Sequence, residues 1–145
     1  MSREIKFRGK RIDTGEWIYG DYFKYQLDIP QKQGYKRTLF YAINYMNEAV
    51  KIYNNASVDP KTVGQFTERK DKNEVEVYAE DIVKVQQGYY PQIIGRVTFE
   101  DGQWMVTKSD GEKWNLYSVT IFMKSIEVIG NMFDNPELLE ANPCS

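Results

Sequence analysis

The sequence predicts a mainly β protein, and three observations support that prediction. Apolar and polar residues alternate with a period of two in several segments, as they do in half-buried strands. Turn signals built on glycine, proline, asparagine and aspartate recur about every ten residues along the chain. Aromatic residues, which favour strands, make up 14% of the chain. No strand–helix–strand rhythm is present, so the pattern indicates a small antiparallel sandwich or barrel.

The chain is expected to open with a β-hairpin. Ile5 and Phe7 alternate with basic residues, and "DTG" at residues 13–15 supplies the turn, because its glycine can take a positive φ. The returning strand divides its side chains between two sides, with Trp17, Tyr19, Phe23 and Tyr25 on one and Ile18 and Tyr22 on the other.

The centre of the chain is harder to interpret. Residues 27–37, "LDIPQKQGYKR", predict an irregular excursion, because Pro30 and Gly34 interrupt a mostly polar stretch. A strand follows over residues 39–45, where Leu39, Tyr41, Ile43 and Tyr45 share one face. A helix through Ala42, Met46, Ala49 and Tyr53 is the open alternative. Asp59 and Pro60 then predict the cap and first position of one helical turn.

The rest of the chain predicts a meander of strands. After a charged turn at residues 68–73, "EVEVYAEDIVKVQQ" forms one long strand or two short ones. "QIIGRVTFE" and "QWMVTKS" flank a "DG" hairpin signal at residues 101–102, and a second "DG" follows at 110–111. "EKWNLYSV" and "IFMKSIEVIGN" complete the set as strands, with a bend at Gly130. Pro136 begins a short C-terminal helix that docks through Leu138 and Leu139.

The composition argues against several kinds of chemistry. The chain has no histidine, which removes the Ser-His and Cys-His routes to an activated nucleophile. Its only cysteine is Cys144, so neither an internal disulfide nor a cysteine zinc site is available. No apolar signal core and no apolar run of membrane-spanning length occurs. We therefore expect a cytoplasmic protein with no cofactor, no metal and no membrane partner.

Basic and aromatic residues supply the candidate interaction surface. The basic residues near the N-terminus could contact phosphates, although a solvated sheet face or a lysine-guarded edge is the favoured interpretation. The aromatic pairs could stack bases, although aromatic residues more often fill a core or an oligomer interface. The candidate residues are Arg3, Lys6, Arg8, Lys10, Trp17, Tyr19, Tyr89, Tyr90, Trp104 and Trp114.

Four acidic residues lie near one another in sequence: Glu74, Glu76, Glu80 and Asp81. A pair of them could serve acid–base chemistry or hold a hard cation such as Mg²⁺. No nucleophile and no cation-binding loop pattern stands beside them. The sequence therefore favours a turn flanked by solvated acids and indicates no catalytic residue.

Three segments together resemble the YopX family of bacteriophage and prophage proteins. They are "REIKFRGKRIDTGEWIYGDY", "VDPKTVGQFTERKDKN" with "EVYAEDIVKV", and "IEVIGNMFDNPELL". The resemblance implies a small antiparallel β region at residues 1–62 and an SH3-like β-barrel with a short terminal helix at residues 63–145. It also implies an origin in a phage or prophage. It implies no activity, so no catalytic, cofactor-binding or metal-binding residue is carried over.

The sequence departs from the family pattern at two turns. The family tends to have glycine after "QFT" and between "Y" and "DIV", where this chain has "ERKDKNEVE" and "YAEDIV". Without glycine those turns must adopt another geometry or tolerate strain.

These observations lead to two expected functions. The favoured one is a non-enzymatic accessory protein of the host bacterial cytosol that forms a homo-oligomer or binds a phage or host protein. The alternative is a nucleic-acid binding module that uses the basic N-terminal strand and barrel aromatics. The net charge of −2 does not attract a polyanion, so nucleic acid is the less favoured partner.

Overall fold

The computed structural model describes residues 3–86, 88–89, 91–123 and 125–140. These residues form two antiparallel sheets and a few short helical segments, so the predicted mainly β class is confirmed. The chain divides into two compact units, residues 2–65 and residues 66–145. Within the described ranges, no helix combines the length and apolar character needed to cross a membrane.

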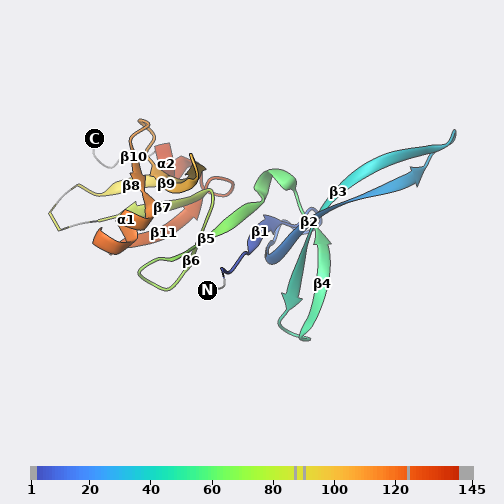
Figure 1. The fold of residues 1–145 in the computed structure, drawn as a ribbon, viewed down its shortest axis with the longest axis horizontal. Coiled ribbons are helices and arrows are strands. Elements are labelled where there is room, and N and C mark those ends of the chain that lie inside the picture. The colour runs from blue at the N-terminus through green and yellow to red at the C-terminus, as the bar shows by residue number, and fades with distance from the viewer. Residues whose placement is uncertain (1–2, 87, 90, 124, 141–145) are drawn as a thin grey trace. The chain divides into compact units, whose positions relative to one another are not determined.

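The described part of the first unit contains four antiparallel strands in the order β4-β3-β2-β1 (Figure 1). They are β1 (Phe7–Lys10), β2 (Trp17–Pro30), β3 (Tyr35–Asn47) and β4 (Ile52–Ser57). The predicted helical turn follows as η1 (Pro60–Thr62), and the Asp59 carboxylate caps it by accepting a hydrogen bond from Lys61 N at 3.0 Å. β5 (Gly64–Lys70) begins in this unit, where Gly64 pairs with Arg8.

β2 and β3 form one long hairpin. The prediction of an irregular excursion at residues 27–37 is therefore wrong. The two strands pair without interruption from Gly20 and Tyr45 to Pro30 and Tyr35. β1 covers only the start of β2, and β4 covers only the end of β3. Residues 25–30 and 35–40, here called the ribbon, therefore pair only with each other among the described strands. Both faces of such a ribbon meet solvent, so its polar residues do not argue against strand.

One face of the first sheet carries a small core. Ile18, Ile43, Ala56 and Val58 are buried there, and half-buried tyrosines, including Tyr22, pack against them. The predicted division of β2 into two sides is confirmed, because Ile18 and Tyr22 lie on this face. We call the other face, which carries Trp17, Tyr19, Phe23 and Tyr25, the open face.

Gly20 allows β2 and β3 to cross closely. A Cβ atom at this position would overlap the carbonyl oxygen of Asn44 on the neighbouring strand. The backbones can therefore approach this closely only where the side chain is absent. In Figure 1 the β2–β3 and β3–β4 hairpins run in different directions from this part of the unit.

The second unit contains a five-stranded sheet in the order β10-β9-β8-β7-β11. Its strands are β7 (Asp81–Val85), β8 (Ile93–Glu100), β9 (Gln103–Thr107), β10 (Lys113–Asn115) and β11 (Ile126–Asn131), and the short β6 (Glu76–Tyr78) pairs with β5. Asp101 and Gly102 have φ values of 50° and 77°, which confirms the predicted tight hairpin turn. β10 and β11 lie at the two edges, so the described strands close no barrel.

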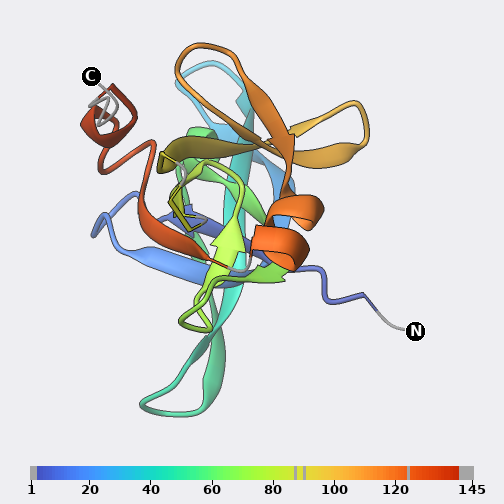
Figure 2. The ribbon, with the colours of Figure 1, turned by 90° about the vertical axis from the view of Figure 1, so that its left-hand side faces the viewer.

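Residues 116–123 are helical rather than extended, which corrects the strands expected in "EKWNLYSV" and at the start of "IFMKSIEVIGN". α1 (Leu116–Ser118) runs into a π-helical turn, η2 (Val119–Met123). The Asn115 side chain caps α1 by accepting a hydrogen bond from Ser118 N at 3.2 Å. Leu116 and Val119 are thereby buried, which an extended strand would have placed differently. Figure 2 shows this segment in orange, apart from the C-terminal helix in red.

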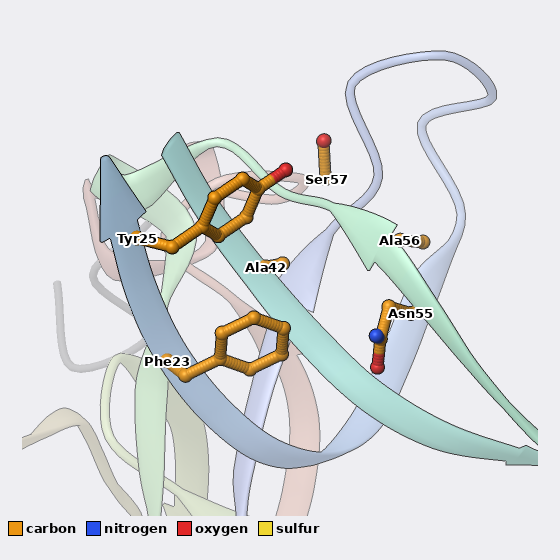
Figure 3. A pocket seen from close by; sticks show the side chains of 6 residues that line it. All are labelled: Phe23, Tyr25, Ala42, Asn55, Ala56 and Ser57. Atoms are coloured by element: carbon orange, nitrogen blue, oxygen red, sulfur yellow. The ribbon is translucent and has the colours of Figure 1, made fainter. Parts of the chain in front are cut away.

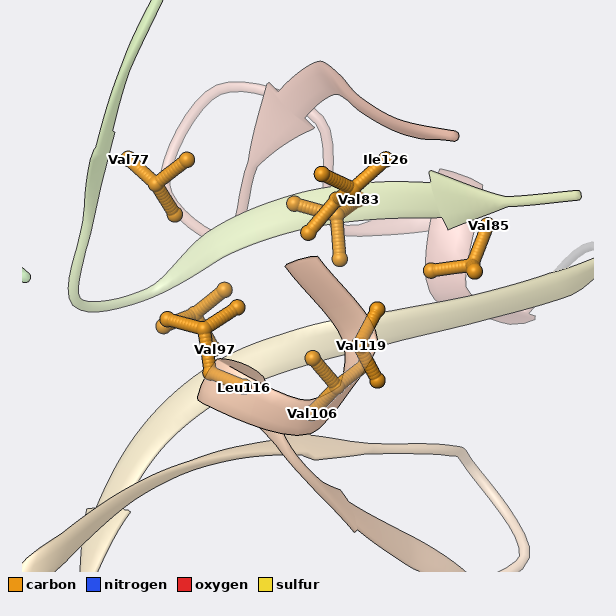
Figure 4. Close-up of a cluster of buried hydrophobic side chains, with 8 residues drawn as sticks. All are labelled: Val77, Val83, Val85, Val97, Val106, Leu116, Val119 and Ile126. Carbon is orange, nitrogen blue, oxygen red and sulfur yellow. The ribbon is translucent and has the colours of Figure 1, made fainter. Parts of the chain in front are cut away.

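The main buried cluster of the second unit is larger than that of the first, and its buried members are all aliphatic. Its eight buried residues are Val77, Val83, Val85, Val97, Val106, Leu116, Val119 and Ile126 (Figure 4). They come from β6 to β9, from the helical segment and from β11, so each of these elements contributes an apolar side chain to one cluster. The alternation of valine with polar residues is what directs them inward.

A buried carboxylate ties the turn after β5 to β11. Asp71 is only 5% exposed, and its oxygens accept hydrogen bonds from the backbone N–H groups of Asn73, Val75 and Val128 at 2.8–2.9 Å. The two turns where the resemblance expects glycine are strained, because Glu74 and Glu80 have φ values of 64° and 70°. The chain therefore tolerates left-handed glutamates at these turns.

The C-terminal segment closes the second unit, as predicted. β11 has a bulge between Val128 and Gly130, and a Cβ at Gly130 would meet the Asn135 side chain at 2.6 Å. The Asn135 amide oxygen accepts a hydrogen bond from Asn131 N, and α2 (Glu137–Glu140) follows directly after Pro136. The residues between β11 and α2 thus have structural roles.

Candidate functional site

The basic N-terminal strand is folded against a tryptophan. β1 places Lys10 opposite Trp17 and Arg8 opposite Tyr19, so all four side chains lie on the open face. The Arg8 guanidinium lies 4.7 Å and the Lys10 ammonium 5.5 Å from the centre of the Trp17 ring. A desolvated cation–π contact of this kind is worth about 2 kcal/mol. Arg8 and Lys10 thus stabilise the hairpin whatever else they bind.

The burial of Arg8 differs from both sequence interpretations. Its side chain is only 6% exposed, so this strand is not a solvated charged face. β1 lies between β2 and β5, so it is not a guarded edge either. Lys6 lies 3.2 Å from the Glu4 carboxylate, and Arg3 is exposed in the segment before β1. The candidate basic residues thus occupy three different environments.

A bidentate ion pair closes the first hairpin. Arg11 donates to the two carboxylate oxygens of Asp13 at 2.9 and 2.8 Å, and it also donates to the Tyr45 hydroxyl at 3.0 Å. The hydrogen bond from Arg11 lowers the pKa of the Asp13 carboxyl below its usual value. The turn predicted at residues 13–15 is therefore tied to β3 through one guanidinium group.

The open face also contains a hollow that the sequence did not predict. A space of about 280 Å³ lies between the rings of Phe23 and Tyr25 on β2 and the side chains of Asn55 and Ser57 on β4 (Figure 3). Ala42 on β3 lies between these two walls, and Ala56 completes the lining. The hollow exists because the middle strand presents an alanine where its neighbours present larger side chains.

The aromatic residues continue from the hollow along the ribbon. Phe23 and Tyr25 stack with their ring centroids 5.8 Å apart, and Tyr25 stacks on Phe40 across the strands at 5.2 Å. Tyr25 and Leu27 remain exposed. The open face therefore carries an apolar row, Phe23, Tyr25, Leu27 and Phe40, on strands that no other described element of this unit covers.

The remaining candidate aromatic residues belong to the second unit. Trp104 and Trp114 are half-buried and pack against its core, as the structural interpretation expected. Trp104 also contacts Phe99 edge-on at 4.9 Å, and Lys108 lies 5.8 Å from the Trp114 ring. Tyr89 is fully exposed, and Tyr90 lies outside the described residues. Trp104, Trp114 and Tyr89 therefore belong to the second unit, whereas Trp17 and Tyr19 belong to the first.

The four acidic residues do not converge. Glu74 lies exposed in its turn, Glu80 pairs with Arg96 at 3.1 Å, and the buried Asp81 accepts a hydrogen bond from Tyr78 N at 2.7 Å. Across the part of the chain that the structure describes, no three acidic or thiol side chains are grouped as a metal ion would require. Glu76 accepts a hydrogen bond from the Tyr78 hydroxyl at 3.3 Å. The burial of Asp81, which is 1% exposed, corrects the expectation that these acids are solvated.

The sequence contains a signal for part of the hollow, in the strand expected at residues 39–45. Its strand at residues 39–45 put Leu39, Tyr41, Ile43 and Tyr45 on one side, which places Phe40 and Ala42 on the other. Tyr53 and Asn55 could not be placed in the same way, because the segment after residue 45 was open to a helical interpretation.

The chain matches one family model and several solved structures. The model, described as YopX protein, matches residues 6–140. Protein EF1440 from Enterococcus faecalis has a similar structure, with a TM-score of 0.53 and 18% identity over 95% of this chain and 99% of that chain. Protein yopX from Bacillus subtilis has a TM-score of 0.53 and 21% identity over 92% of this chain and 97% of that chain. No curated protein sequence matches.

The TM-scores of the two structural matches show a shared fold. Because both sequence identities are low, the matches show the fold alone. The family match runs from residue 6, just before β1, to the end of α2, so it contains the second and third segments of the resemblance and all but the first three residues of the first. The chain belongs to the YopX family.

Proposed function

We propose that this protein is a non-enzymatic binding module that self-associates through the open face of its first unit. The observation that supports this proposal is the apolar row formed by Phe23, Tyr25, Leu27 and Phe40. Three of its members, Tyr25, Leu27 and Phe40, lie on the ribbon, whose strands pair only with each other among the described residues. A two-stranded ribbon is marginally stable in water by itself, and covering its apolar side chains would stabilise it.

The chemistry of the row suits a protein interface. Aromatic side chains bury a large area, and they are enriched where proteins meet. Tyr25 and Phe40 already hold each other in place by stacking, so little side-chain freedom remains to be lost on binding. A second copy of the chain presents the same row, which makes a symmetrical interface the simplest arrangement.

Light scattering and sedimentation of the wild-type chain over a range of concentrations test this proposal. We expect a dimer or larger species that dissociates on dilution, and Tyr25→Ser should shift the equilibrium to monomer. Tyr35→Ser is the matched control, because Tyr35 is 74% exposed on the opposite face of the same ribbon. A wild-type chain that remains a monomer at high concentration would contradict self-association.

The charge distribution favours a second candidate, nucleic-acid binding. Residues 2–65 contain eleven lysines and arginines against seven acidic residues, a net charge of +4, whereas residues 66–145 contain eight against fourteen, a net charge of −6. Tyr19, which is exposed, lies on the same face as Lys10 and could stack a base. Titration with labelled single- and double-stranded DNA separates the two candidates. DNA binding that weakens steeply as the salt concentration rises would support the nucleic-acid candidate. The absence of DNA binding at low salt would rule it out.

Four further expectations accompany the proposal. An SH3-like barrel for residues 63–145 stays a prediction, as do a phage or prophage origin, action in the host cytosol, and a phage or host protein as partner. Each of these expectations is compatible with a small binding module that catalyses no reaction.

A further inference from the structure

The outer edge of β4 is open over most of its length. On one side β4 pairs with β3 from Ile52 to Ser57. On the other side Ile12 N donates a hydrogen bond to the Ser57 carbonyl at 3.0 Å, and Arg11 forms a bridge with Val58. Among the described residues nothing pairs with this edge from Ile52 to Ala56. These five residues can therefore accept another strand.

This edge lacks the features that usually protect one. Proteins guard exposed edges with charged side chains, proline or bulges. Ile52–Ser57 contains no charged residue and no proline, and its pairing with β3 is regular. Ile52 and Tyr53 are also 58% and 66% exposed. A second copy of the same strand would bring no like charges together within the paired segment, because Ile52–Ser57 carries none.

The hydrogen bond from Ile12 fixes which backbone groups point outward. The Ser57 carbonyl faces away from β3, and outward groups recur every second residue. The N–H and C=O groups of Tyr53 and Asn55 therefore face the open edge. An antiparallel second copy centred on Asn54 pairs Tyr53 with the partner's Asn55, and Asn55 with the partner's Tyr53. A pairing centred on Asn55 would instead need the Ser57 carbonyl, which Ile12 already occupies.

The hollow on the open face fits this pairing. Tyr53 and Asn55 are two residues apart, so their side chains lie on the same side of the sheet as the hollow. In the pairing centred on Asn54, the partner's Tyr53 lies directly opposite Asn55, which forms one wall of the hollow. Its ring can then extend toward Phe23 and Tyr25. By symmetry, each copy supplies one tyrosine and one hollow.

We propose that two copies of this chain join their β4 edges antiparallel about a twofold axis at Asn54, with Tyr53 of each copy covering the hollow of the other. This inference rests on the proposed self-association and adds its register and its anchoring residue. Four backbone hydrogen bonds, two tyrosines and two hollows make up the contact. The arrangement joins the two first-unit sheets into one continuous sheet.

A cysteine cross-link tests the twofold axis directly. Residues at the centre of an antiparallel pair that is not hydrogen-bonded have Cα atoms about 4.5 Å apart, within disulfide range. We expect Asn54→Cys, made with Cys144→Ser, to form a covalent dimer under mild oxidation. Lys36→Cys in the same background is the matched control on the ribbon and should stay monomeric. Equal cross-linking at both positions would overturn the inference.

Substitutions on β4 test the hydrogen bonds and the anchor. Asn55→Pro removes an N–H group that faces away from β3, so the β3–β4 pairing keeps its hydrogen bonds. We expect it to abolish the dimer, and Tyr53→Ser to raise the dimer dissociation constant at least tenfold. Circular dichroism checks that each variant is folded. If Asn55→Pro does not fold, the Asn54→Cys cross-link still tests the pairing.

The outcomes separate this inference from the broader proposal. A wild-type dimer that survives both Asn55→Pro and Tyr53→Ser overturns the β4 pairing but leaves self-association through the open face intact. A wild-type chain that is monomeric at every concentration overturns both. A β4 edge that binds only strands of other proteins would appear as the second outcome, and it too would overturn the inference.

Discussion

The two units of this protein build their sheets on cores of different size and chemistry. The second unit buries eight aliphatic residues from five strands and two helical segments in one cluster. The cluster of the first has four buried residues, with half-buried tyrosines packed around them, and a cation stacks on Trp17 on the other face of the sheet. The second sheet is therefore stabilised mainly by the aliphatic cluster of its own unit. The first leaves one face open, and that face is where a partner would add stability.

The difference also explains where the aromatic residues lie. In the second unit Trp104 and Trp114 lie at the margin of an aliphatic core. On the open face of the first unit, Phe23, Tyr25 and Phe40 follow strands that no other described element of that unit covers, and they stack on each other instead. Stacked rings retain part of their contact when one side meets water, whereas branched aliphatic residues need a closed interior.

The largest expected effect is the loss of a core side chain in the second unit. Leu116 is 1% exposed in the aliphatic cluster, so Leu116→Ala should lower the free energy of unfolding by about 2–5 kcal/mol. Hydrogen exchange should show the loss in residues 66–140, with residues 3–65 keeping most of their protection. An equal loss in both units would break the distinction between the two cores.

Asp71 should have the next largest effect. Asp71→Ala leaves three buried backbone N–H groups without their acceptor, which should cost roughly 2–3 kcal/mol. Urea denaturation measures the loss, and Lys72→Ala in the same turn is the control. If the two variants unfold alike, the turn after β5 is not held by this carboxylate.

Glu74 offers a stabilising change. Its φ of 64° favours glycine, so Glu74→Gly should raise the free energy of unfolding by about 1 kcal/mol. Glu76→Gly, placed in the regular strand β6, should lower it by a similar amount. A melting temperature that falls in both variants would argue against strain at this turn.

The smallest expected effect concerns the ion pair of the first unit. Arg11→Gln should return the pKa of Asp13 toward its usual value, because it removes the main hydrogen-bonding group that lowers it. A lowered folded-state pKa contributes stability that is present above the unfolded pKa and is lost as the pH falls through the folded one. An NMR titration of the Asp13 carboxyl in both proteins checks the shift, and an identical pKa would contradict the role of Arg11.

Much of the fold follows from local sequence. Alternation placed Ile18 and Tyr22 opposite Trp17 and Tyr19, and the turn at Asp101 and Gly102 followed from its residue types. The ribbon was missed because a strand with two exposed faces has no apolar alternation to reveal it. The helical segment at residues 116–123 was missed because its cap, Asn115, and its buried residues also suit a strand.

The candidate site was less predictable than the fold. Sequence could group Arg8 and Lys10 on one face, but their contact with Trp17 depends on the register of the hairpin. The hollow depends on three neighbouring strands, with Ala42 in the middle one, and no single segment contains that information. The open edge of β4 appears only once it is known which strand lies at the end of the sheet.

Hydrogen–deuterium exchange of the wild-type chain at low and high concentration tests the central claim most directly. If the open face and its β4 edge form the interface, the amides of Tyr53 and Asn55 should exchange more slowly at high concentration. Those of Val83 and Val97 in the second core should not change. Exchange at Tyr53 and Asn55 that is fast at every concentration would contradict the account.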